Sequence, residues 1–194
     1  MNYLIFGGAF DPPHMAHINV AKMALQKTHN DRVLFMPAYH SPFGKKMSSF
    51  EDRESMIRFA LDNYEDEKLC CFDYEAHLPT LRGTYHILKT IVSIFHRKDH
   101  FEYLIGGDQA KSITHWIKWR ELLQLVPFVV VTRDGEEGIP SIFYTGHHKV
   151  IVSPNWNVSS TQIREQIKTG KKPKELHDNV FRYIKQHNLY RGQK

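Results

Sequence analysis

The fold of this chain is decided by the stretch GGAFDPPHMAH, which runs from Gly7 to His17. An apolar segment at residues 3–6 precedes it and has the length and the aromatic and β-branched content of a buried strand. A helical repeat of apolar residues follows from Ile18 onward. The stretch itself therefore predicts a tight turn from a strand into a helix, with Asp11 as the N-cap and the two prolines in the first helical turn.

The composition of this turn points to an anionic ligand. Gly7 and Gly8 let the backbone bend sharply and leave amide groups that a ligand can approach closely. His14 and His17 are three residues apart and are expected on one face of the first helical turn. Because a helix start carries about half a positive charge, a cationic histidine is not favoured there, whereas a phosphate is. An ordinary turn with two exposed histidines is the competing interpretation.

Strand and helix patterns alternate along the chain and predict an α/β fold, a Rossmann-like doubly wound parallel sheet with helices on both faces. We expect strands near residues 3–6, 32–36, 69–74, 101–105, 127–132 and 150–152. Ser48 with Glu51 has the spacing of a capping box and predicts a helix start. Ligands of such sheets bind beyond the carboxyl ends of the strands, where the Gly7-Gly8 turn begins.

The bulk composition narrows the classes of function. The net charge of +5 comes from scattered residues, which favours acidic small molecules and gives no basic block for a nucleic acid. The sequence shows neither an apolar run long enough to span a membrane nor an export signal. The adjacent Cys70 and Cys71 point to opposite faces of their expected strand and fit a reducing compartment. The 13 histidines include no metal-binding spacing.

These features predict a cytoplasmic protein with one domain over residues 1–194 and a helical C-terminal part from about residue 159. We expect small-molecule partners, with no nucleic acid, no membrane and no metal held by protein ligands. A homo-oligomer is left open. A nucleic-acid-binding module would need a basic, aromatic-lined face and is the weakest alternative.

A second stretch, SSTQIR at residues 159–164, also predicts a phosphate site. Ser159 with Gln162 has capping-box spacing, and Arg164 follows within two turns, where a cation opposes the helix dipole. A polyphosphate would stabilise that arginine, whereas the alternative is a surface pair with Glu165. Two phosphate-binding helix starts on one sheet indicate a nucleoside triphosphate, although the Walker, GxGxxG and GxSxG patterns are all missing.

Together the two stretches resemble the signature of the HxGH nucleotidyltransferase superfamily. In detail, GGAFDPPH at residues 7–14 and VSSTQIR at residues 158–164 are similar to the bacterial nicotinate-nucleotide adenylyltransferases. The resemblance runs over nearly the whole chain, including FMP at residues 35–37 and IGGD at residues 105–108. It implies transfer of AMP from ATP, used with Mg²⁺, to nicotinate or nicotinamide mononucleotide, with release of pyrophosphate.

Carried over residue by residue, the resemblance implies two sets of ligands. The ATP-binding set is Gly8, Ala9, Phe10, His14, His17, Gly107, Asp108, Ser160, Thr161 and Arg164. The mononucleotide-binding set is Lys45, Lys46, Thr84, Trp116 and Arg133. Three of these residues would be catalytic: His14 and His17 would stabilise the charge that develops at the α-phosphorus, and Arg164 would bind the β- and γ-phosphates. Trp116 would stack on the pyridine ring, although a core tryptophan is the alternative.

Three features depart from the family pattern. Ala16 replaces the glycine of HxGH, residues 82–84 read RGT where the family has SYT, and the expected loop lysine is Lys45 or Lys46. Two alternatives to the implied function are kept: another HxGH nucleotidyltransferase, such as phosphopantetheine adenylyltransferase or a cytidylyltransferase, and a non-catalytic nucleotide sensor.

Overall fold

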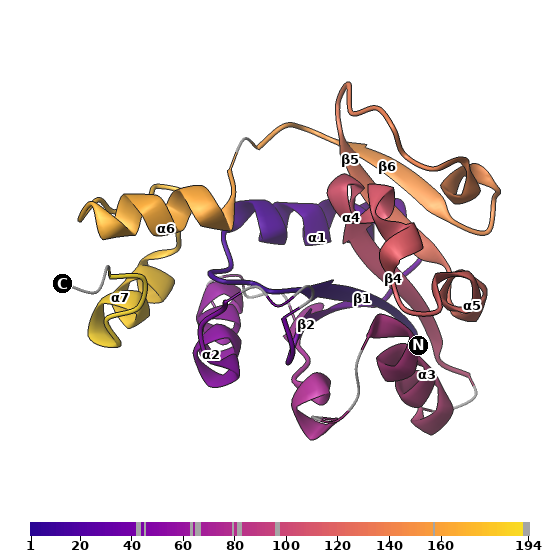
Figure 1. The fold of residues 1–194 in the computed structure, drawn as a ribbon, viewed down its shortest axis with the longest axis horizontal. Coiled ribbons are helices and arrows are strands. Elements are labelled where there is room, and N and C mark those ends of the chain that lie inside the picture. Colours follow the sequence, from indigo (N-terminus) through magenta and orange to yellow (C-terminus); the bar gives the residue numbers. More distant parts are fainter. Residues whose placement is uncertain are drawn as a thin grey trace.

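A parallel six-stranded sheet in the order β3-β2-β1-β4-β5-β6 forms the centre of the molecule (Figure 1). The computed structural model describes residues 1–41, 44, 46–62, 64, 67–78, 80, 83–95, 98–156 and 158–191. Its strands are β1 (Asn2–Gly8), β2 (Arg32–Pro37), β3 (Leu69–Cys71), β4 (His100–Gly106), β5 (Phe128–Arg133) and β6 (Lys149–Ser153). The predicted doubly wound parallel sheet is confirmed, and the strand order reverses between β1 and β4.

Helices cover both faces of this sheet. The α-helices are α1 (Met15–Lys27), α2 (Phe50–Leu61), α3 (Thr84–Ile94), α4 (Gly107–Lys111), α5 (Trp119–Leu125), α6 (Ser160–Lys168) and α7 (Asp178–Gln186). Short 3₁₀ turns are η2 (Tyr74–His77), η3 (Ile113–His115) and η4 (Ser141–Tyr144). Neighbouring side chains of a strand point to opposite faces. Accordingly, Leu4 and Phe6 of β1 pack in one buried cluster with α1, α2, α6 and α7, whereas Ile5 packs in the other with α3 and α5.

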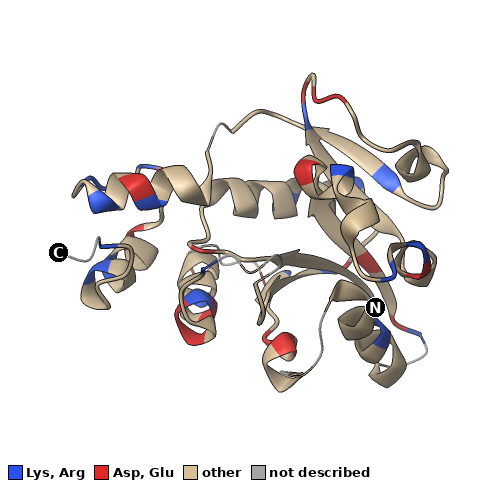
Figure 2. Cartoon of the chain, viewed as in Figure 1, with Lys and Arg blue, Asp and Glu red and all other residues tan. Residues whose placement is uncertain are grey.

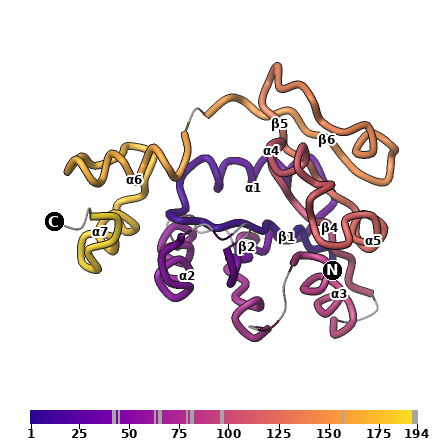
Figure 3. The backbone as a smooth tube through the Cα atoms, in the orientation of Figure 1, coloured from indigo at the N-terminus to yellow at the C-terminus, as the bar shows by residue number. Residues whose placement is uncertain are grey.

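The C-terminal helices lie at the opposite end of the molecule from α5 (Figure 1). After β6 the chain crosses toward the side of α1 and continues into α6 (Figure 3). The next helix, α7, packs on α2 through Val180 and Ile184, which are both buried in the cluster that contains Ile57. This path brings the second predicted phosphate stretch back to the first.

Three local predictions are wrong. The first helix begins at Met15, because the Asp11 carboxylate accepts hydrogen bonds from Tyr190 and from the Ser48 amide and is not available as a cap. The second helix is capped by Ser49, whose hydroxyl accepts from the Asp52 amide. The third strand stops at Cys71, because this edge strand pairs with β2 over three residues only and the chain then enters η2. The predicted capping of α6 by Ser159 with Gln162 is confirmed.

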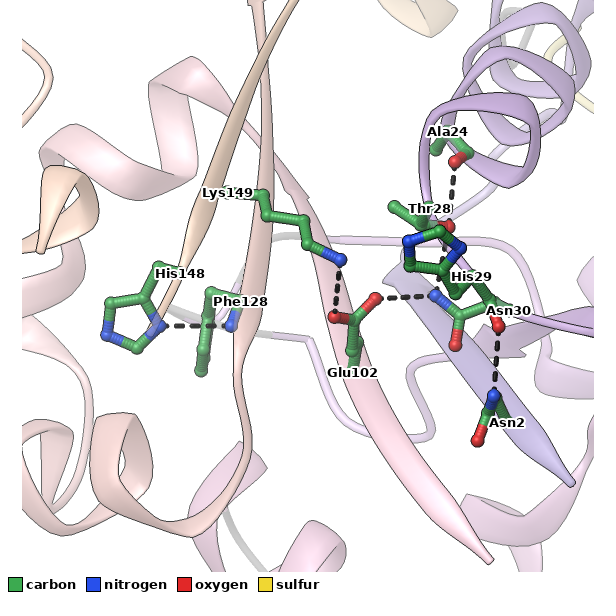
Figure 4. Close-up of polar contacts among 9 residues, drawn as sticks. All are labelled: Asn2, Ala24, Thr28, His29, Asn30, Glu102, Phe128, His148 and Lys149. Atoms are coloured by element: carbon green, nitrogen blue, oxygen red, sulfur yellow. Dashed lines mark hydrogen bonds and ion pairs between the residues drawn. The ribbon is translucent and has the colours of Figure 1, made fainter. Parts of the chain in front are cut away.

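Polar contacts connect the amino ends of the strands with one another (Figure 4). The Glu102 carboxylate accepts hydrogen bonds from Asn30 and from the Lys149 ammonium, the latter at 3.2 Å. His148 Nδ1 accepts from the Phe128 amide at 3.1 Å. These groups find their partners within the protein, so this edge is held by internal contacts.

Lysine, arginine and acidic residues are distributed over several elements of the molecule, although α1 and α3 carry lysines and no acidic residue (Figure 2). No helix among the residues described has the length and apolar character needed to cross a bilayer. The two cysteines, Cys70 and Cys71, are half-buried and not bonded to each other.

Candidate active site

A cavity of about 360 Å³ opens at the carboxyl ends of β1 and β4, where the strand order reverses. Three segments far apart in the sequence form its walls: the turn after β1, the start of α4 and the start of α6. The cavity-lining residues that belong to the expected ATP set are Gly8, Ala9, Phe10, His14, His17, Gly107, Asp108 and Ser160. The reversal point of an open α/β sheet is the usual position for a ligand.

The two histidines form a stacked pair on the cavity wall. Their ring centroids are 3.8 Å apart, and the backbone amide of His14 donates to Nδ1 of His17 at 3.2 Å. Because Nδ1 of His17 accepts this bond, the proton of the neutral ring is on Nε2. Burial lowers the pKa of His14 to about 4, and burial together with the nearby His14 holds the pKa of His17 well below its usual value. Both rings are therefore neutral at pH 7 and can donate an N–H group.

His14 has an unsatisfied polar atom. Its side chain is 6% exposed, and its Nδ1 is buried without a hydrogen-bond partner in the part of the chain that the structure describes. Leaving such a group unpaired costs about 1–3 kcal/mol. The residue itself lines the cavity, so His14 combines a buried, unpaired nitrogen with a place in the cavity wall.

Lowering the pH is expected to destabilise the fold through His14. The unfolded chain takes up this proton near pH 6.5, but the folded chain does so only at about 4. Between these values the unfolded state binds more protons, so the free energy of unfolding falls as the pH falls, by roughly 3 kcal/mol in full. Urea unfolding at pH 7 and pH 4.5 measures this loss. His14→Gln should lose less than the wild type, and an unchanged pH dependence would contradict the assignment.

The turn after β1 is held in place by the ring of Phe10 and by hydrogen bonds to its carbonyl oxygens. Phe10 has a positive φ of 48°, and its ring lies so close to Gly8 that a Cβ there would be 3.1 Å away from it. The same ring contacts His17 edge-to-face at 5.1 Å. The carbonyl oxygens of Gly8 and Ala9 accept hydrogen bonds from the Ala38 amide and from Arg53. The backbone that carries the expected amide donors is thus fixed in place.

Arg53 is a supporting residue to which the sequence assigned no role. It is 1% exposed and donates to the carbonyl oxygens of Ser48 and Ala9, each at 3.0 Å. The nearby Asp11, Glu75 and other acidic groups oppose the effect of burial, which lowers the pKa of this guanidinium. The sequence signal for its burial is its position four residues before Ile57, which places both residues on the inner face of α2.

The start of α6 braces the same turn. Ser160 Oγ donates to the carbonyl oxygen of Pro12 at 2.9 Å, and Arg164 Nη1 donates to that of Asp11 at 2.7 Å. Arg164 Nη2 also contacts Thr161 Oγ1 at 3.1 Å, which places Thr161 and Arg164 beside the cavity and not in its wall. Glu165 pairs with a lysine one helical turn away, so the alternative of an Arg164–Glu165 surface pair is not observed.

Thr84 and Trp116 come together around Tyr103, a residue that the sequence did not single out. The Tyr103 hydroxyl is hydrogen-bonded to Thr84, and its ring lies edge-on to Trp116 with centroids 6.5 Å apart. That hydroxyl would be only 1.9 Å from a Cβ on Gly7, so glycine is required where Tyr103 passes. Both predicted residues therefore lie next to the turn after β1.

The remaining predicted mononucleotide ligands are dispersed. Arg133 lines the cavity near Asp108, among the expected ATP ligands. Lys46 is exposed and does not line the cavity, and Lys45 lies outside the described residues.

One side of the cavity is formed by the loop after β5. The Glu136 carboxylate accepts from the Arg133 amide and pairs with Lys111, both at 2.9 Å. Its oxygens would be 2.5 Å from a Cβ on Gly107, so they rest directly on that glycine.

The fold and the cavity define a Rossmann-like nucleotide-handling protein. Residues 5–166 match the family model described as cytidylyltransferase-like. The chain is 31% identical to a probable nicotinate-nucleotide adenylyltransferase of Anaeromyxobacter dehalogenans (97% of this chain, 96% of the relative) and 32% identical to one of Shewanella woodyi (96% and 98%). The fold matches the nicotinic acid mononucleotide adenylyltransferase of Plasmodium falciparum complexed with NaAD, with a TM-score of 0.80 at 22% identity and 97% coverage of both chains. This chain therefore belongs to the cytidylyltransferase-like family and, within it, to the nicotinate-nucleotide adenylyltransferases.

Proposed function

We propose that this enzyme transfers AMP from ATP to nicotinate mononucleotide and releases pyrophosphate. The observation that carries this proposal is the stacked pair of neutral imidazoles, His14 and His17, on the wall of the cavity. An N–H donor aimed at a phosphate oxygen is what adenylyl transfer requires.

In the reaction, a phosphate oxygen of the mononucleotide attacks the α-phosphorus of ATP, and the bond to the β-phosphate oxygen breaks. The nucleophile is already an anion, so no general base is needed, and catalysis consists of positioning and charge stabilisation. The imidazoles of His14 and His17 donate to the α-phosphate oxygens, on which charge builds up. Arg164 and Thr161, which lie beside the cavity, hold the phosphates that depart as pyrophosphate.

Mg²⁺ enters with ATP as part of the substrate. Within the described ranges, no group of three or more His, Cys, Asp or Glu side chains could hold a metal ion. Mg²⁺ commonly binds substrate phosphates and retains several waters, so it can enter the site on ATP without a cluster of protein ligands. When bound, the ion neutralises the departing pyrophosphate.

The acceptor is proposed to bind beside Trp116 and Thr84, with the pyridine ring on the indole. Tyr103 holds these two residues together next to Gly7. We further propose that residues 1–194 act as one domain in the cytoplasm, without nucleic acid or membrane as partner.

Pyrophosphate release with three acceptors tests the function. We expect turnover with nicotinate mononucleotide, less with nicotinamide mononucleotide and none with phosphopantetheine. Preference for phosphopantetheine would favour the other HxGH enzyme, and an absence of turnover with either pyridine nucleotide would reject the proposal. A sensor would bind ATP without turnover.

A further inference from the structure

Trp156, which neither motif includes, lines the same cavity as His14 and Asp108. It lies in the connection between β6 and α6 and is half-buried. The other two tryptophans are engaged elsewhere: Trp116 packs against Tyr103, and Trp119 lies under the Arg120 guanidinium at 4.3 Å. Over the described ranges of the chain, the indole of Trp156 makes no ring contact of this kind. Its flat face is therefore available to a ligand.

The cavity extends along the carboxyl ends of the strands, from the histidines after β1 toward the end of β6. His14 and His17 follow β1, Gly106 ends the neighbouring β4, and Gly106 pairs with Val131 of β5. Trp156 follows the end of β6, the next strand outward. Val131, Pro154 and Val158 line the cavity together with Trp156, so the indole has apolar neighbours there beside the polar Arg133, Glu136 and Ser153.

A nucleotide has the same two-part chemistry. Its phosphates match the histidine end, and its base needs a flat apolar partner at the other end. Gly107 and Asp108 line the cavity at the start of α4, directly after β4. In the sheet, β4 lies between β1, which leads to the histidines, and the strands β5 and β6, which lead to Trp156. A ribose held there would direct the base toward the indole.

We propose that Trp156 stacks on the adenine of ATP and is a residue that determines the affinity for the base. This inference deepens the proposed function, since it names a base-binding residue of the same site. Stacking requires no hydrogen bond from the indole and leaves the transferred phosphate untouched. Its loss should therefore weaken ATP binding more than it slows the chemical step.

Intrinsic tryptophan fluorescence gives a direct readout. ATP added without mononucleotide should quench the wild type and the Trp119→Phe control, and the quenching should disappear in Trp156→Phe. Tripolyphosphate, which has no base, should bind without quenching. The proposal fails if ATP does not quench the wild type, if Trp156→Phe retains full quenching, or if tripolyphosphate quenches equally.

Kinetics provide the second measurement. Trp156→Ala should raise KM for ATP by roughly 10- to 100-fold with little change in KM for the mononucleotide, and Trp156→Phe should restore most of the affinity. Tyr144→Ala removes an aromatic ring that is 63% exposed and outside this cavity, and it should change neither value. An unchanged KM for ATP in Trp156→Ala overturns the inference.

The proposed function and the role of Trp156 can fail separately. Quenching by ATP does not involve an acceptor. If it depends on Trp156 but no pyridine nucleotide is used, the proposed function fails and the inference stands. If AMP transfer occurs and ATP binding does not depend on Trp156, only the inference fails.

Discussion

Replacing His17 with alanine is expected to lower kcat by about 100- to 1,000-fold, the usual cost of removing one preorganised donor to developing charge. The backbone amide of His14 holds Nδ1 of His17, so the proton of the ring is fixed on Nε2. The ring is also positioned by Phe10, against which it packs edge-to-face. A donor held in this way contributes mainly in the transition state, so ATP should still bind.

Steady-state pyrophosphate release and ATP binding measured on the same preparation check this prediction. His115→Ala, which removes an exposed histidine outside the cavity, is the matched control and should retain wild-type rates. A His17→Ala enzyme with normal kcat would remove the histidine pair from the mechanism. Weaker ATP binding with an unchanged kcat would instead assign His17 to ground-state binding.

Arg53→Met is expected to destabilise the protein by about 3–5 kcal/mol, because it removes one side of a buried charge network. The guanidinium bonds to the carbonyl oxygens of Ser48 and Ala9 and faces Asp11. Without it, these acceptors and the carboxylate stay buried without their cation. The free energy of unfolding of Arg53→Lys should lie between those of the wild type and Arg53→Met, since lysine keeps the charge but lacks the planar guanidinium with its several donors.

Urea unfolding of the purified variants measures this effect. Arg58→Met on the same helix is the matched control, since its side chain is 52% exposed and pairs with Glu54 at the surface. Surface pairs contribute about 0–1 kcal/mol, so the control should change little. If Arg53→Met loses no more than Arg58→Met, the support of the turn after β1 does not depend on this cation.

The sheet could be predicted because its information is local. Each strand is a short apolar run, and each glycine-rich turn follows such a run directly, so the α/β class and the strand sites are visible in neighbouring residues. The two stretches that are predicted to bind phosphate are recognisable for the same reason, and the structure brings them together through Ser160 and Arg164.

What the sequence did not reveal depends on contacts between distant residues. Asp11 has the sequence features of a helix cap, but its partner Tyr190 is 179 residues away. Tyr103 has the pattern of an ordinary buried strand residue, and only the close approach of its hydroxyl to Gly7 gives it a place near the site. Arg53 shares the inner face of α2 with Ile57, but its partners, the carbonyl oxygens of Ser48 and Ala9, become visible only in the fold.

The bracing of the histidine-bearing turn by α6 has a consequence for substrate loading. Ser160 and Arg164 of α6 donate hydrogen bonds to that turn, so we expect this wall of the cavity to be rigid. Across from it, the Glu136 carboxylate rests on Gly107, pairs with Lys111 and accepts a hydrogen bond from the Arg133 amide. We expect the loop after β5 to change position when a nucleotide binds, whereas the turn that carries the histidines keeps its conformation.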